Sequence, residues 1–169
     1  MIAIVDTEST GLPNQEWARV VEIGAVVLHP HRDYAEVNSF SSLLRVDSLD
    51  DRATRALDYC GISVASVDGA PRPPDVRRAF YEWMAQHQVT EVFSYNRTFD
   101  ETMLKRSGFE LPWVGCVMRM SRTAMPGLKK DPSLAAAAAH FGVALTEAHR
   151  ALPDARAAAE VFAAIRRRK

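Results

Sequence analysis

Two carboxylates one residue apart follow an apolar run at the start of the chain. Residues 2–5 are all apolar, and Asp6 and Glu8 come directly after them, ahead of Gly11. A short apolar run bounded by a turn is typical of a buried strand, and residues two apart on a strand project to the same side. Charge at the end of a buried strand is costly unless it is compensated, as a bound cation would do. The spacing therefore indicates a metal-binding strand end.

Two further segments place acids where a helix is expected to begin. Asn96 and Asp100 follow the apolar run 91–95, while His149 and Asp154 precede an alanine-rich stretch. The helix dipole alone favours an acid in a first turn by about 0.3–1 kcal/mol. A single histidine is also more often structural than catalytic. Each segment therefore has an ordinary structural explanation when it is taken alone.

Taken together, four carboxylates and one histidine fit the hydrolysis of phosphate esters. Mg²⁺ and Mn²⁺ prefer carboxylate oxygens, and two such ions about 3.5–4 Å apart form the two-metal site of phosphoryl transfer. One ion lowers the pKa of a bound water, and the other stabilises the leaving oxygen. A histidine, whose unperturbed pKa is near neutral, can take the proton of that water. Four carboxylates would suffice to hold such a pair of ions.

Size and charge limit the alternatives. The 169 residues are 47% apolar and 25% charged, which is typical of a single globular domain spanning residues 1–169. The formal net charge is zero, so no global basic field attracts nucleic acid. Any nucleic-acid binding must therefore come from a local site. The basic residues predicted to follow a bound strand are Arg97, Arg119, Lys129, Lys130 and Arg150.

The cysteines and the apolar runs predict a cytoplasmic protein. Cys60 and Cys116 are far apart and form no CxxC motif, so we expect both to be reduced. No apolar run approaches the roughly 20 residues that span a bilayer, and no signal peptide is evident. The chain nearly ends after its last motif, so we expect a stand-alone nuclease or a subunit that docks through its own surface.

The order of elements predicts an α/β fold. Three strands with short connections indicate an antiparallel meander, and helix–strand units follow on a mixed sheet. Strands are expected at the N-terminus and over 20–28, 37–46, 91–95 and 113–118. Helices are expected from Ser48 to Tyr59, from Asp75, from Thr98 to Ser107, from Asp131 and from Pro153. Thr98 forms a predicted capping box with Glu101, and Pro132 takes the first position of the helix that begins at Asp131. An irregular loop is expected over 61–74.

Three motifs give the chain a resemblance to a known family. Residues 6–12 fit Asp-x-Glu followed by Thr-Gly, residues 96–100 fit Asn-x-x-Phe-Asp, and residues 149–155 fit His-x-Ala-x-x-Asp-Ala. The chain resembles the DEDDh (DnaQ-like) 3′–5′ exonucleases, which include the proofreading subunit of bacterial DNA polymerase III and ribonuclease T. The resemblance covers nearly the whole chain. It departs from the usual pattern at Ser9, Tyr95, Arg97 and Cys60, the last in a loop that otherwise resembles His-Gly-Ile-Thr.

The resemblance implies a ribonuclease H-like fold with a five-stranded mixed sheet flanked by helices. It implies that His149 is the general base and that two divalent cations, Mg²⁺ or Mn²⁺, are bound by Asp6, Glu8, Asp100 and Asp154. Asp6 would touch both ions. The substrate-binding residues implied in the same way are Thr7, Thr10, Leu12, Asn96 and Phe99. Leu12 and Phe99 offer apolar surface to a terminal base, although core packing is the ordinary alternative for Phe99.

The leading functional prediction is a metal-dependent 3′–5′ exonuclease of DNA replication or repair. Such a hydrolase would cleave phosphodiester bonds at the 3′ end and release nucleoside monophosphates. One alternative is an exoribonuclease that trims RNA or short oligonucleotides, because the motifs do not separate the two sugars. An alternative of another class is a nucleic-acid-binding or polymerase-binding module. The expected partners are single-stranded DNA or RNA 3′ ends and a DNA polymerase, with no membrane.

Overall fold

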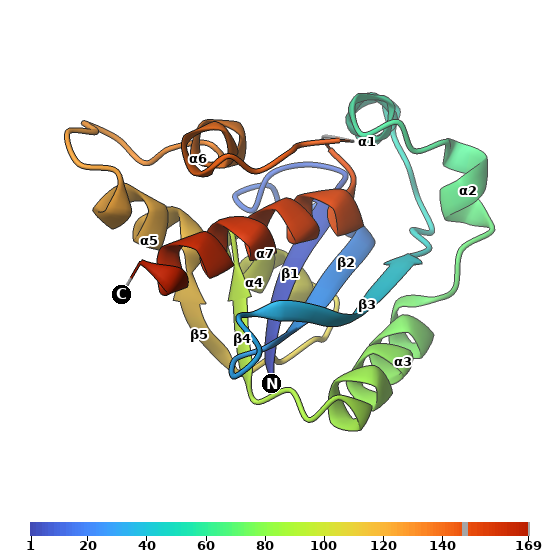
Figure 1. The fold of residues 1–169 in the computed structure, drawn as a ribbon. Helices are drawn as coiled ribbons and strands as arrows, with labels where there is room; N and C mark the ends of the chain where they lie inside the picture. The colour runs from blue at the N-terminus through green and yellow to red at the C-terminus, as the bar shows by residue number, and fades with distance from the viewer. Residues whose placement is uncertain (147–148, 169) are drawn as a thin grey trace.

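One five-stranded sheet forms the centre of the protein (Figure 1). The computed structural model describes residues 1–146 and 149–168. The strands lie in the order β3-β2-β1-β4-β5, with β1 in the middle. Their bounds are β1 (Ile2–Ser9), β2 (Val20–His29), β3 (Ala35–Leu43), β4 (Glu91–Ser94) and β5 (Trp113–Cys116).

The sheet is mixed, as the sequence predicts. Strand β1 pairs antiparallel with β2, and β2 pairs antiparallel with β3, which confirms the predicted meander. Strands β4 and β5 continue the sheet from the other side of β1 in parallel. Because β1 and β4 run the same way, their carboxyl ends meet at one edge of the sheet. That edge is where ligands of open α/β sheets usually bind.

Helices cover both faces of the sheet (Figure 1). Helix α7 crosses one face, with α5 and α6 beside it, and α3 and α4 cover the other face. Helices α1 and α2 lie beyond the carboxyl end of β3. The helices in the part of the chain described are α1 (Asp51–Tyr59), α2 (Val64–Asp68), α3 (Pro73–Gln86), α4 (Arg97–Arg106), α5 (Val117–Ala124), α6 (Leu134–Phe141) and α7 (Ala151–Arg167).

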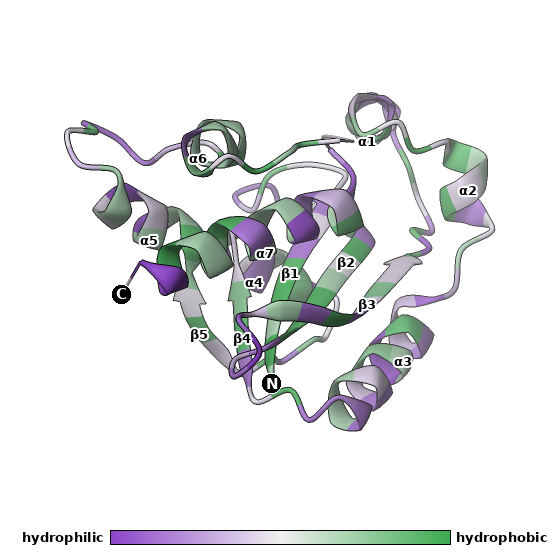
Figure 2. Ribbon diagram, in the orientation of Figure 1, coloured by the Kyte–Doolittle hydropathy of each residue, from purple (hydrophilic) through white to green (hydrophobic). Residues whose placement is uncertain are grey.

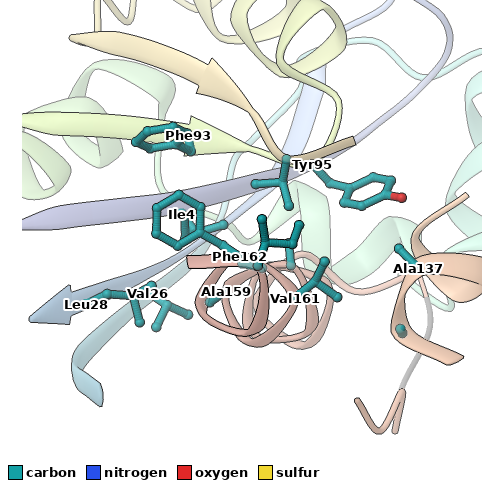
Figure 3. Packing of buried hydrophobic residues seen from close by; sticks show 14 of the residues in the cluster. Ile4, Val26, Leu28, Phe93, Tyr95, Ala137, Ala159, Val161 and Phe162 are labelled. Atoms are coloured by element: carbon teal, nitrogen blue, oxygen red, sulfur yellow. The ribbon is translucent and has the colours of Figure 1, made fainter. Parts of the chain in front are cut away.

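Alternate residues of the central strand enter two different cores. Ile4 packs on the α7 side, against Phe162 and Phe93 (Figure 3). Its neighbours Ala3 and Val5 belong to the other core, which contains residues of α3 and α4. A strand covered on both faces must be apolar throughout, and Figure 2 shows β1, β2 and β4 as mainly hydrophobic. Full burial stabilises each large apolar side chain by about 1.5–3 kcal/mol.

Several helix boundaries differ from the prediction because other capping groups are better placed. Helix α1 is capped by Asp50, whose side chain accepts from two backbone N–H groups, and not by Ser48. Helix α4 begins at Arg97, so the predicted Thr98 capping box is wrong. Glu101 of that pair instead accepts a hydrogen bond from Arg97 at 2.8 Å.

The remaining corrections also involve helix starts. Ser133 caps α6, so Asp131 does not begin that helix. Helix α7 begins at Ala151, ahead of Pro153, because proline fits any position in a first turn. A short helix, α2, lies within the predicted irregular loop and is capped by Ser63. Residues 117–124 form α5, so the strand predicted over 113–118 is too long and ends at Cys116.

A glycine lets the first turn of α7 approach the sheet. Gly24 of β2 lies opposite Asp6 of β1. A Cβ atom at Gly24 would fall well inside van der Waals contact with the backbone of Ala151 and Leu152. Backbone atoms cannot move aside as a flexible side chain can, so only glycine permits this approach. The position of the acid in the first turn of α7 therefore depends on Gly24.

We predict that Gly24→Ala will push the first turn of α7 off the sheet. The free energy of unfolding should fall by about 1–3 kcal/mol, the usual cost of overpacking, as measured by urea denaturation. Gly69→Ala is the matched control, because a Cβ there meets only one atom, at 3.4 Å. Equal stability of the Gly24→Ala protein and the control would contradict the close approach.

Candidate active site

Because successive side chains of a strand point to opposite faces, the polar residues of β1 lie on both faces of the sheet. Asp6 and Glu8 continue the row of Ile4 and face α7, whereas Thr7 continues the row of Val5 and faces α4. The strand is fully buried up to Val5, while Asp6 and Glu8 are half-buried. The carboxylates thus lie where the sheet first becomes accessible to solvent.

Three carboxylates meet on the α7 side of the strand end. Asp6, Glu8 and Asp154 each offer an oxygen, and these oxygens all lie within 4.8 Å of one another. Asp154 Oδ2 accepts from the backbone N–H of His149 at 3.1 Å. Asp154 Oδ1 is buried and has no hydrogen-bond partner in the described part of the chain. Clustered hard oxygens with one unsatisfied buried atom fit a divalent cation such as Mg²⁺ or Mn²⁺.

Asp100 approaches the same strand from the α4 side. It is only 2% exposed, and its Oδ1 accepts from the Thr7 hydroxyl at 2.8 Å. It is not among the three acids that share the 4.8 Å cluster. Its charge still acts on Asp6, whose pKa is raised well above its usual value by burial first and then by Asp100 and Glu8. The fourth predicted acid therefore borders the cluster.

Burial dominates the electrostatics of all four acids. It raises the pKa values of Glu8 and Asp154, and it raises the pKa of Asp100 to about 7. Removing a carboxylate from water disfavours its charged form, and the neighbouring acids add repulsion. A cation between these groups would offset both effects. The site is therefore arranged to bind positive charge.

His149 is exposed and is joined to one acid of the cluster. Its backbone has a φ of 66°, an uncommon conformation for a residue other than glycine. Its ring lies 4.3 Å from the ring of Tyr59 between centroids, and its Nε2 lies 2.9 Å from the Tyr59 hydroxyl. With its N–H bonded to Asp154, His149 is held beside the carboxylates.

Two residues of the site were missed by the sequence analysis. Glu22 is 2% exposed and accepts from the guanidinium of Arg150 and the N–H of Ala151. The Cys60 thiol donates to Glu8 Oε2 at 3.1 Å. The signal for Glu22 was a single acid within the otherwise apolar run 20–28. The signal for Cys60 was its place in the loop that resembles His-Gly-Ile-Thr, where the usual histidine is missing.

Two of the basic residues predicted to follow a bound strand form ion pairs within the protein. Arg150 pairs with Glu22 at 2.7 Å and Arg97 pairs with Glu101 at 2.8 Å, and their place along a bound strand stays a prediction. The pair at Arg150 fixes the segment that carries His149 into the first turn of α7. Arg150 thus supports the site.

The residues predicted to bind substrate lie in different environments. Leu12 is 57% exposed beyond the end of β1, and Asn96 is exposed at the start of α4. Phe99 is partly buried against the α3/α4 core. Thr7 and Thr10 are buried, with Thr7 bonded to Asp100 and the Thr10 hydroxyl accepting from Arg19 N–H. Their side chains therefore support the fold.

The comparison with protein families shows to which family the chain belongs. A model of the exonuclease family (RNase_T) matches residues 3–162. The chain belongs to this family. The resemblance to DEDDh exonucleases and the prediction of an enzyme of the 3′–5′ exonuclease class are thereby confirmed.

Curated relatives and solved structures agree with this assignment. The PolC-type DNA polymerase III of Clostridium perfringens is 29% identical over 165 residues, and that of Staphylococcus epidermidis is 28% identical over 162 residues. Both matches cover 94% of this chain and 11% of the relative, so the chain spans about a tenth of the length of these relatives.

Solved nucleases share the fold. The nuclease domain of 3′hExo, a DEDDh family member bound to rAMP, gives a TM-score of 0.76 at 19% identity, covering 99% of this chain and 92% of that chain. Escherichia coli exonuclease I with a dT13 oligonucleotide gives a TM-score of 0.72 at 13% identity, and the match covers 96% of this chain and 40% of that chain. The predicted ribonuclease H-like fold is confirmed. Within residues 1–146 and 149–168, no helix is long and apolar enough to cross a membrane.

The raised pKa of Asp100 leads to a stability prediction for the metal-free protein. A carboxyl with a raised folded pKa binds more protons in the native state, so its stabilising effect is lost as pH rises toward about 7. In EDTA, the melting temperature should fall between pH 5.5 and pH 8. Asp100→Asn should reduce that fall and raise the melting temperature at pH 8. The rise should be about 2–4 °C for each kcal/mol gained in the free energy of unfolding.

Calorimetry at both pH values would measure these melting temperatures. Asp58→Asn, which replaces an exposed acid on α1, is the matched control and should behave as the unmodified protein does. Mg²⁺ at pH 8 should stabilise the unmodified protein more than the Asp100→Asn protein. The account fails if Asp100→Asn and Asp58→Asn give the same dependence on pH.

Proposed function

We propose that residues 1–169 act as a single exonuclease domain that removes nucleotides from the 3′ end of DNA. The observation that carries the proposal is the meeting of Asp6, Glu8 and Asp154, with one buried oxygen left without a hydrogen-bond partner, in a chain of the exonuclease family. Clustered acids that only stabilised the fold would be expected to form hydrogen bonds or ion pairs within the protein.

Two divalent cations, Mg²⁺ or Mn²⁺, are proposed to occupy the site. Asp6, Glu8 and Asp154 would hold one ion, and Asp6 with Asp100 would hold the other. When bound, they would supply an activated water and positive charge beside the leaving oxygen. The hard oxygen ligands favour these ions over softer ones.

Residues of the chain are proposed to assist the hydrolysis of the phosphodiester bond. His149 takes the proton of the attacking water at a ring nitrogen as the water oxygen bonds to phosphorus. The bond between phosphorus and the 3′ oxygen of the preceding nucleotide breaks, and that oxygen leaves and is protonated. A nucleoside 5′-monophosphate is released. Asp154 holds His149 in place by accepting its backbone N–H.

The exposed side chains around the carboxylates are proposed to receive the strand end. Leu12 and Phe99 offer apolar surface on which a terminal base can stack. Asn96 stands exposed at the start of α4, one turn before Asp100. Thr7 and Thr10 would contribute through the backbone of residues 7–11, since their side chains are turned inward.

DNA is preferred as substrate because the curated relatives are DNA polymerases of the PolC type. A role in replication or repair, with a DNA polymerase as partner, follows from the same likeness. A cytoplasmic setting agrees with the free thiols of Cys60 and Cys116. The second candidate is an exoribonuclease, because structural neighbours include a nuclease bound to rAMP and one described as recognising a histone mRNA stem-loop.

Digestion of end-labelled strands tests the proposal. Single-stranded DNA and RNA of one sequence, labelled at the 5′ end, would be incubated with Mg²⁺, Mn²⁺ or EDTA. We expect a ladder that shortens from the 3′ end, requires the metal and is faster on DNA. Faster trimming of RNA would establish the second candidate. Retention of both labelled strands uncut in every metal would favour a binding module.

Substitutions then assign the chemistry. Asp6→Asn should reduce cleavage to background because it removes a ligand charge, and His149→Ala should lower kcat by about 10²–10⁴, the usual contribution of a general base. Asp131→Asn is the matched control, because that acid lies in the loop before α6, away from the cluster, and pairs with Arg122. Full activity of Asp6→Asn would contradict the proposed site.

A further inference from the structure

The C-terminal end of α1 contacts two groups of the candidate active site. Its last residue, Tyr59, places its hydroxyl 2.9 Å from His149 Nε2. The next residue, Cys60, donates its thiol hydrogen to Glu8 Oε2 at 3.1 Å. Helix α1 carries none of the family motifs, yet it touches both the proposed base and a proposed metal ligand. This end of α1 therefore belongs to the architecture of the site.

The backbone at this end of α1 is well anchored. Gly61 has a φ of 65°, and the Ile62 N–H bonds back to the Leu57 carbonyl at 2.9 Å, as in a left-handed helix cap. Leu57 and Ile62 are both buried in a small core with Val21 and Val67. The direction in which Tyr59 leaves the helix is therefore fixed by buried neighbours.

The side chain of Tyr59, in contrast, is exposed. It is 69% exposed, although a tyrosine usually covers most of its ring. Its ring rests on the His149 ring at 4.3 Å between centroids, with a tilt of 45°. Two contacts, one through the ring and one through the hydroxyl, thus hold the imidazole from the side of α1.

The imidazole is held from the other side by its own backbone. The His149 N–H donates to Asp154, and the strained φ of 66° sets the direction of its side chain. A hydrogen bond at one ring nitrogen orients a catalytic histidine and determines which nitrogen carries the proton. The Tyr59 hydroxyl is in the place to form that bond.

We propose that Tyr59 is a positioning residue for His149, holding its imidazole at the orientation in which it accepts the proton of the attacking water. This inference rests on the proposed function and deepens it. Tyr59 acts through the histidine and touches no reacting atom. The sequence motifs identify the histidine but give no residue for this task.

The test is Tyr59→Phe, which keeps the ring contact and removes the hydroxyl. With a 5′-labelled oligonucleotide and Mg²⁺, kcat should fall about tenfold while KM stays within about twofold, because only the orientation of the base is lost. Tyr81→Phe is the matched control: the Tyr81 hydroxyl bonds to the backbone of Glu110, on the α3 side of the molecule. That variant should keep the unmodified kcat.

A double-mutant cycle separates positioning from a structural role. In a His149→Ala protein, measured by single turnover at high enzyme concentration, adding Tyr59→Phe should change the rate by less than about twofold. An equal tenfold loss in that background would overturn the proposal, because Tyr59 would then act without the histidine. An unchanged or increased kcat in Tyr59→Phe alone would also overturn it.

A spectroscopic measurement keeps the test independent of activity. In ¹⁵N-labelled, metal-free protein, the Nε2 resonance of His149, assigned with His149→Ala, should shift in Tyr59→Phe and stay in place in Tyr81→Phe. An Nε2 resonance that does not move in Tyr59→Phe overturns the contact itself. If the unmodified protein cleaves neither DNA nor RNA, the proposed function fails, and this shift still decides whether Tyr59 holds His149.

Discussion

The loss of solvent around a cluster of carboxylates is the constraint on which this site depends. Asp6, Glu8 and Asp154 bring oxygens within 4.8 Å of one another, and Asp100 adds a buried charge from the other side of β1. Burial raises the pKa of each of them, because the charged form of a carboxylate loses its favourable interaction with water, and holding all four ionised therefore has an energetic cost. A cation is the ligand that would relieve it.

The rest of the fold holds these acids in place. Strand β1 packs on one face against the core that contains α7 and on the other face against the core that contains α3 and α4. This packing on both faces fixes the end of β1 beside α7 and α4. On the α7 side, Gly24 permits the close approach of the helix, and Glu22 binds Arg150 and the N–H of Ala151. On the α4 side, the Thr7 hydroxyl binds Asp100. The acids of β1, α4 and α7 are therefore held in place by contacts between segments that are far apart in the sequence.

The sequence predicts the parts of the structure that depend on local pattern. The apolar run before Asp6, the meander that follows it and the spacing of the three motifs all have short-range signals. The five-stranded mixed sheet and the family were predicted on that basis. Helix starts were less predictable, because the sequence offers two acceptable caps for one helix: Ser48 and Asp50 for α1, and Asp131 and Ser133 for α6. Only the packing of each helix selects between them.

The supporting contacts could not be predicted because they join residues far apart in the chain. Glu22 meets Arg150 across 128 positions, Cys60 meets Glu8 across 52, and Tyr59 meets His149 across 90. Arg150 illustrates the same point, because the acid that pairs with it lies on β2, far away in the sequence. A charge beside a motif therefore does not reveal its partner until the fold is known.

The central claim is that the clustered acids form a site for two cations beside a bound nucleotide. The most direct measurement is an anomalous difference map from a crystal grown with Mn²⁺ and a nucleoside 5′-monophosphate. Two peaks are expected about 3.5–4 Å apart, one next to Asp6, Glu8 and Asp154 and the other between Asp6 and Asp100. A map with no peak at these carboxylates, from a crystal in which the nucleotide is visible, would contradict it.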